Sequence, residues 1–278
     1  MNKINFIFAF FIAFAIIGCD IVEPPYRKGG DITPVDTTKK KVLLEDFTGF
    51  RCGNCPEATH VAEMIANQYP GRVIVIALHA GPLAVPTPIR RYDFRTQETN
   101  ELATFYGLIA TPYGLVNRRQ YVGQNLLAPT AWGGYVQEQL NVDADLKMYL
   151  ETDFNESTRE ISLQVQLEYL RQGNVNHNLA VYILEDSVVQ YQQDDRQPAI
   201  HISDYVHNHV MRGSFTGTWG LPVSDVAVSA GSKLTVPFKY TISSERDWRP
   251  SKLSLVAFVH DNTTKEVIQV EQIKLFKE

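Results

Sequence analysis

Two cysteines at the start of a helical pattern constrain the fold of this chain more than any other feature. Cys52-Gly53-Asn54-Cys55 closely follows an apolar run at residues 42–47, which predicts a buried strand. Apolar residues then recur every three or four positions over residues 58–66, which predicts an amphipathic helix. A second apolar run at residues 73–78 predicts another buried strand. This order is a βαβ unit with its cysteine pair at the N-terminus of the helix.

The residues around this unit resemble those of the thioredoxin superfamily. Asp46 precedes Cys52 by six residues, which is the position of the buried acid in that family. Thr111-Pro112 matches the cis-proline loop of the family, and a helical pattern at residues 130–140 matches its last helix. The resemblance covers residues 41–142 and implies an α/β thioredoxin-like domain.

The resemblance also implies a role for each residue. Cys52 attacks a substrate disulfide as a thiolate, which a helix N-terminus favours. Cys55 resolves the mixed disulfide, and Asp46 accepts the proton of Cys55. Thr111 and Pro112 present their backbone to an extended substrate peptide.

Three positions depart from the family pattern. Gly53-Asn54 stands between the cysteines where the most reducing members have Gly-Pro, and Arg51 replaces the usual Trp. Ala77 falls where a basic residue often partners the buried acid. Two other interpretations of Cys52 and Cys55 therefore stay open, a disulfide that only staples the helix to its loop and a metal site.

The N-terminus has the features of a secretory signal peptide at residues 1–18. Lys3 precedes an apolar run from Ile4 to Ile17, shorter than the roughly 20 residues of a membrane-spanning helix. An uncleaved anchor is the alternative. The run ends in Ile-Ile-Gly-Cys, which resembles a bacterial lipoprotein box and implies lipid on Cys19 and attachment to a membrane. Residues 19–40 show no periodicity and predict a flexible tether.

The cysteine count supports a redox role. The chain has three cysteines, so lipidation of Cys19 leaves Cys52 and Cys55 with only each other as partners. Exported proteins meet an oxidising environment, where an isolated Cys-x-x-Cys is most simply a redox pair. The formal net charge of −5 argues against a dedicated nucleic-acid binder. No phosphate-binding loop is present in the sequence, and we expect no cofactor.

The pattern changes to alternation in the second part of the chain, residues 145–278. Apolar and polar residues alternate from Ile161 to Tyr169, which predicts a half-buried strand. Further strands are predicted at residues 179–184, 234–240, 253–259 and 267–275. Strands separated by turns predict an all-β immunoglobulin-like sandwich domain.

Residues 190–232 are an exception, a long segment rich in Gln, His, Gly and aromatic residues. A strand over residues 204–213 puts His207, His209 and Met211 on one face. This face is either a ligand site with His201 as a further ligand, or a polar face with packing histidines. No Cys or acidic partner completes a metal set, so we expect no metal. The aromatic loop around Trp219 is a second binding candidate.

The lipoprotein signal, the Cys-x-x-Cys, residues 205–213 and the closing hairpin at 254–269 together resemble the 28-kDa outer-membrane lipoprotein family of Bacteroidetes. The resemblance implies an outer-membrane lipoprotein on either the periplasmic or the surface face. Two functions follow as hypotheses. The first is a thiol–disulfide oxidoreductase acting on protein thiols or disulfides. The second is an adhesin or receptor for a host or envelope protein, with the thioredoxin fold as a scaffold.

Overall fold

The structure is a computed structural model that describes residues 26–28, 38–196 and 200–276. The predicted signal peptide at 1–18 and the predicted lipid site at Cys19 lie outside the described residues. One part of the predicted tether is a strand, because β1 (Tyr26–Lys28) pairs antiparallel with β5 (Leu146–Asn155). Among the helices that the structure describes, none is both long and apolar enough to cross a membrane.

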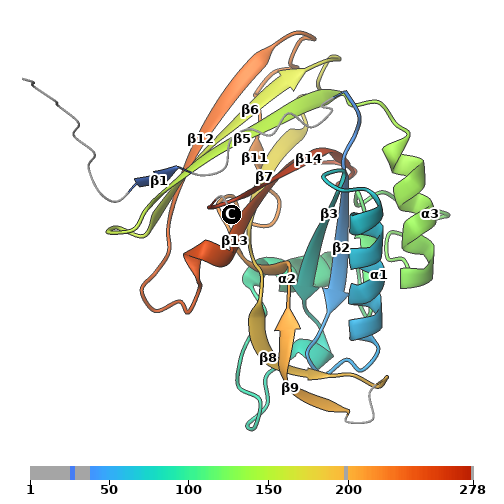
Figure 1. Cartoon of the computed structure of the whole chain (residues 1–278). Helices are drawn as coiled ribbons and strands as arrows, with labels where there is room; N and C mark the ends of the chain where they lie inside the picture. The colour runs from blue at the N-terminus through green and yellow to red at the C-terminus, as the bar shows by residue number, and fades with distance from the viewer. Residues whose placement is uncertain (1–25, 29–37, 197–199, 277–278) are drawn as a thin grey trace, which may run out of the picture.

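The predicted βαβ unit is present. The chain forms β2 (Val42–Thr48), α1 (Cys55–Gln68) and β3 (Val73–His79), and β2 and β3 pair in parallel. Next to β2 on its other side lies β4 (Tyr113–Val116), antiparallel to it. α1 and α3 (Pro129–Leu140) pack together on one face of these strands (Figure 1). Both helices are where the sequence predicts them.

The insertion between β3 and β4 contains a short 3-10 turn, η1 (Pro82–Ala84), and the helix α2 (Gln97–Phe105). α2 begins at Thr96, whose hydroxyl accepts a hydrogen bond from the backbone N–H of Thr99, while Thr99 bonds back to Thr96. This capping box explains why the helix starts at this point.

The remaining elements are almost all strands. Three form a four-stranded sheet with β1, namely β5, β6 (Glu160–Tyr169) and β12 (Lys233–Thr241). The others are β7 (His177–Glu185), β8 (Val188–Gln193), β9 (His201–His207), β10 (Val210–Ser214), β11 (Leu221–Pro222), η2 (Pro250–Lys252), β13 (Leu253–Asp261) and β14 (Val267–Lys274). The molecule is therefore mostly β-sheet with few helices.

The main sheet runs across the predicted boundary at residues 142–145, which differs from the expectation of a separate sandwich. Its order is β14-β13-β7-β10-β3-β2-β4, with β11 beside β7. The junction is between β10 and β3, where Val210 pairs with Ala77 and Ala77 N donates to His209 O at 2.8 Å.

The burial of β7 explains this continuity. Every residue of β7 is buried, so the strand needs cover on both faces, as strands inside a layered sheet do. One face packs against the four-stranded sheet, through residues such as Val181 and Leu163. The other face packs into the core of the βαβ half, through residues such as Tyr182 and Ile76.

Candidate active site

Cys52 and Cys55 lie where β2 ends and α1 begins, and they form a disulfide bond. α1 starts at Cys55, so Cys52 precedes the helix and lies in a turn closed by its N–H donating to Gly49 O at 2.9 Å. Both cysteines are covered, with exposed fractions of only 2% and 1%. The pair therefore sits at the predicted place, but the folded chain shields it from solvent.

Asp46 is buried on the α1 side of β2. Its Oδ2 accepts a hydrogen bond from Thr59 Oγ1 at 3.4 Å, and its Oδ1 has no hydrogen-bond partner within the described residues. Burial raises the pKa of Asp46 to about 7, and the Thr59 bond opposes that rise. Ala77 pairs in register with Asp46 on the neighbouring strand β3, so the residue beside Asp46 at this position is not basic.

Thr111 and Pro112 come to the same end of β2. The peptide bond between them is cis. Phe47 pairs with Tyr113, so Pro112 falls opposite the last residue of β2, next to the turn that carries Cys52. The Oγ1 atom of Thr111 is buried and has no hydrogen-bond partner in the part of the chain that the structure describes.

A cavity of about 10 Å³ lies beside Cys55, a volume near that of one water molecule. Thr59, His79 and His207 contribute to its wall. His79 Nδ1 and His207 Nε2 are both buried, and no described protein group bonds to either. The cavity therefore connects Cys55 to Thr59, which bonds to Asp46, and to two imidazoles.

Both imidazoles are held neutral by their surroundings. Burial lowers the pKa of His207 to about 4, and hydrogen bonds to the backbone of Tyr191 and Gln190 oppose the change. Burial, followed by repulsion from His207 when it is protonated and from Arg212, holds the pKa of His79 well below its ordinary value. Near neutral pH, Asp46 rather than either histidine changes its charge.

The segment Val188–Arg196, which we call the covering arm, lies over the disulfide. It consists of β8 and the three residues after it, and Figure 1 shows β8 and β9 at the end of the sheet where α1 begins. Gln193 N donates to Phe50 O at 2.8 Å, and Asp195 N donates to Gly53 O at 3.0 Å. A Cβ on Gly53 would overlap the Asp195 carboxylate, so the arm and the turn are in direct contact.

Side-chain hydrogen bonds and an ion pair also hold the covering arm against the turn and α1. Gln192 is buried, and its Nε2 donates to Cys52 O at 3.0 Å and to Gly49 O at 3.3 Å. Arg196 forms an ion pair of 2.6 Å with Glu57 in the first turn of α1. The sequence did not predict this cover, because the arm binds to a turn that lies far away in the chain, 140 residues apart for Gln192 and Cys52.

The proposed histidine face does not form. The chain breaks between β9 and β10 at His209, whose φ of 56° is left-handed, so the strand predicted over 204–213 is wrong as a single strand. His207 packs against the ring of Phe94 at 4.6 Å, while Met211 lies in the core. No group of His, Cys, Asp and Glu among the described residues has metal-site geometry.

The remaining candidates from the sequence, His201, His209 and Trp219, each contact a different part of the fold. His209 faces Asp186 at 3.5 Å, and His201 Nδ1 bonds to the hydroxyl of Tyr191. Trp219 is partly buried, with its ring 4.8 Å from that of Phe105. These residues therefore do not converge on one site.

One buried pair was missed from the sequence. Arg118 is completely buried and donates to both carboxylate oxygens of Glu45, at 2.8 and 2.6 Å. Burial acts to lower the pKa of Arg118, but Glu45 and then Tyr182 outweigh it and hold the pKa above its ordinary value. The apolar neighbours of Glu45 on β2 gave the only signal, since a lone acid inside a buried strand needs a cation.

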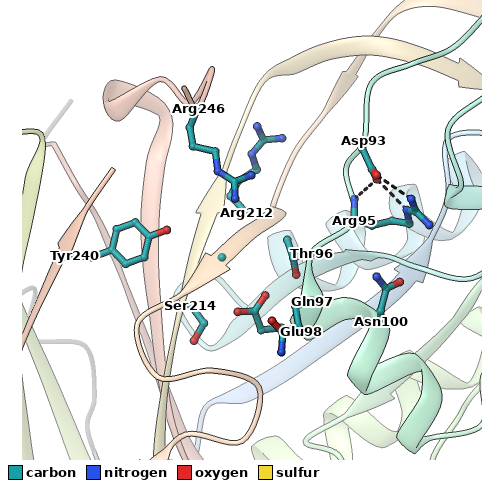
Figure 2. A pocket seen from close by; sticks show the side chains of 11 residues that line it. Asp93, Arg95, Thr96, Gln97, Glu98, Asn100, Arg212, Ser214, Tyr240 and Arg246 are labelled. Carbon is teal, nitrogen blue, oxygen red and sulfur yellow. Dashed lines mark hydrogen bonds and ion pairs between the residues drawn. The ribbon is translucent and has the colours of Figure 1, made fainter. Parts of the chain in front are cut away.

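A second, polar cleft of about 440 Å³ lies between α2 and the strands β10 and β12. Figure 2 shows Arg212, Arg246 and Tyr240 on one side and Glu98 on the other. Arg212 is paired with Glu185 and Asp247. Arg246 lies over the Trp248 ring and pairs with no carboxylate in the described residues.

The strand order, the cysteine pair, the buried acid and the cis-proline together define a thioredoxin-like domain within a mostly β chain. The comparisons with known proteins then place the chain more closely. Residues 99–278, well over half of the chain, match the family model of the outer membrane protein Omp28. The chain belongs to the Omp28 family.

Two solved structures agree with the fold. HBP35 of Porphyromonas gingivalis superimposes with a TM-score of 0.66 at 20% identity, covering 86% of this chain and 76% of that one. A protein of Agrobacterium tumefaciens has a TM-score of 0.50 at 12% identity, covering 86% and 96%. A domain of the outer membrane lipoprotein Omp28 from P. gingivalis shares 22% identity over 48% of this chain and 89% of that one, with a TM-score of 0.32. No curated protein matches the chain significantly.

Proposed function

We propose that this protein is a thiol–disulfide oxidoreductase of the cell envelope, with Cys52 and Cys55 as its redox pair. The observation that carries the proposal is Asp46, a fully buried carboxyl beside the helix that follows the disulfide, with one oxygen that bonds to no group among the described residues. Such a group destabilises the fold when ionised, so its presence favours a chemical role over a structural one. A disulfide that only staples a loop has no need of it.

The reaction follows from the positions of these groups. In the reduced protein, the Cys52 thiolate attacks a substrate disulfide, a mixed disulfide forms, and one substrate sulfur leaves as a thiolate. Cys55 then loses its proton to Asp46, and its thiolate attacks Cys52 Sγ. The second substrate sulfur leaves, and the protein disulfide forms. The substrate has gained two electrons, and the same steps in reverse oxidise a substrate dithiol.

The proposal includes the location. Membership in an outer-membrane protein family is consistent with the outer membrane. Lipid on Cys19 would hold the chain there, with protein thiols or disulfides of the envelope as substrates. Thr111 and Pro112 would position the substrate backbone next to Cys52.

The test uses the chain from residue 41 onward with a matched pair of cysteine variants. Cys55→Ser should trap a mixed disulfide with a protein substrate, and Cys52→Ser should trap none. The reduction potential, measured in glutathione buffers with thiol alkylation, should lie between about −120 and −270 mV. A potential below about −300 mV, with no exchange above the Cys52→Ser control, would show that the disulfide is a staple.

A second candidate function is a receptor or adhesin that uses the fold as a scaffold. The cleft in Figure 2 favours it, because the cleft is polar and Arg246 has no carboxylate partner among the described residues. A ligand with an anionic group fits that arrangement. Arg246→Ala should then abolish capture of the anionic ligand or partner, while Cys52→Ser should leave it intact. Unchanged capture by Arg246→Ala would exclude the cleft as the site.

A further inference from the structure

The covering arm makes the contacts that an incoming substrate strand would make. Its main-chain donors at Gln193 and Asp195 bond to the carbonyls of Phe50 and Gly53, on either side of Cys52. Extended peptides commonly bind proteins through such main-chain hydrogen bonds, with side chains supplying specificity. In this structure the acceptors beside the reactive pair are already occupied by the chain itself.

We propose that the covering arm occupies the docking surface for an extended polypeptide segment, which must displace it to reach Cys52. The inference rests on the proposed exchange function and names its substrate class. Arg196 reaches Glu57 from the arm, so the displacing segment carries a basic side chain for the same carboxylate. Asp195 covers Gly53, where no side chain intervenes, so a polar side chain of the segment fits above it.

The two ends of the arm are held differently, which makes displacement of one end feasible. Val188 is buried in a small apolar cluster with Phe50 and Phe94, and this anchors the start of the arm. From Gln192 onward, the contacts with the turn are polar. The ion pair of Arg196 with Glu57 is largely exposed, with 41% and 56% of the two side chains accessible. Exposed pairs contribute little to stability. Gln192 and Asp194 are buried but polar, so separation of this end exposes hydrogen-bonding groups to water without opening an apolar core.

The experiment measures access to the disulfide in the full exported chain. A double variant, Gln192→Ala with Arg196→Glu, removes the amide that holds Cys52 O and sets two like charges at Glu57. We expect reduction of the disulfide by dithiothreitol, and by a reduced protein dithiol, to accelerate about tenfold or more, because the buried hydrogen bonds of Gln192 are lost and the charges at Glu57 repel.

Three controls keep the result interpretable. Arg196→Glu combined with Glu57→Arg restores the pair between these two positions with reversed charges, but not the pair of Arg196 with Asp194, and should return the Arg196→Glu reduction rate part of the way to wild type. Arg171→Glu breaks a surface ion pair with Asp145 and should change nothing. Circular dichroism and thermal unfolding verify that each variant is folded.

Unchanged reduction rates in the folded Gln192→Ala/Arg196→Glu variant would overturn the docking proposal. The exchange function can fail separately, because reduction by a small dithiol reports access whether or not the protein reacts with protein disulfides. Where exchange occurs, Glu57→Gln should lose the preference for disulfide peptides with a nearby Arg or Lys over neutral ones, whereas the double variant, which keeps Glu57, should retain it. Retention of that preference in Glu57→Gln would contradict the assignment of Glu57.

Discussion

Two neighbouring acids on β2 have contrasting environments in this fold. Glu45 and Asp46 are both buried, and successive strand residues point to opposite faces of the sheet. Glu45 faces the C-terminal half and binds Arg118 through two short hydrogen bonds. Asp46 faces α1 and, within the part of the chain that the structure describes, its side chain has one long hydrogen bond, from Thr59. A paired charge fixes a structure, whereas an unpaired one retains a proton that it can exchange near neutral pH.

The paired side of β2 joins the two halves of the molecule. Arg118 Nη2 also donates to the hydroxyl of Tyr182, which in turn donates to Thr218 O at 2.6 Å. The guanidinium carbon lies 4.8 Å from the centre of the Phe258 ring. One cation thus connects β2 with β7 and β13, the strands that continue the sheet beyond β3.

Removal of that cation should have the largest effect. Arg118→Met leaves the Glu45 carboxylate buried without a partner, so we expect a loss of about 3–5 kcal/mol in the free energy of unfolding, measured with urea. The double variant Glu45→Met/Arg118→Met should recover most of the loss, because apolar residues can replace a buried pair. A loss below about 1 kcal/mol in the single variant would mean that the pair does not join the halves.

Replacement of Asp46, the acid without a cation partner among the described residues, should stabilise the fold rather than destabilise it. Because the pKa of Asp46 is raised to about 7, the folded chain binds more protons than the unfolded chain between about pH 4 and 7, and stability falls as pH rises through this window. Asp46→Asn should therefore stabilise the protein by about 2–4 kcal/mol at pH 8 and by little at pH 4. Exchange at pH 8 should slow by about 10²-fold. Destabilisation at pH 8 would show that Asp46 is structural.

His207, in the wall of the small cavity, should affect the stability of the fold at acid pH. The pKa of His207 is lowered to about 4, so the unfolded chain binds more protons between about pH 6.5 and 4, and stability is lost as pH falls. His207→Phe should reduce that loss by about 1–2 kcal/mol at pH 5 relative to pH 8. His60→Phe, an exposed position on α1, serves as the control. Equal slopes for wild type and His207→Phe would contradict the burial of a neutral imidazole.

The sequence predicts the local pattern well and the long-range contacts poorly. Cys52, Cys55 and Asp46 could be located because spacing within one βαβ unit fixes their separation. The burial of Arg118 could not, since its partner on β2 and the strand β7 that covers it come from distant segments. The covering arm was missed for the same reason. Main-chain hydrogen bonds to the turn that carries Cys52 hold the arm in place, and its own sequence has no distinctive pattern.

The prediction with the smallest expected effect concerns the hydrogen bond that Asp46 accepts from Thr59. The Thr59 hydroxyl donates to the ionised carboxylate and so lowers its pKa, against the larger effect of burial. Thr59→Val should raise the pKa of Asp46 further, by about half a unit to one unit, and move the pH midpoint of exchange upward by the same amount. Thr104→Val, whose hydroxyl bonds to Asn100 O on the exposed side of α2, is a matched control and should leave the midpoint unchanged. A midpoint that stays fixed in Thr59→Val but moves in Asp46→Asn would show that Asp46 exchanges its proton without help from Thr59.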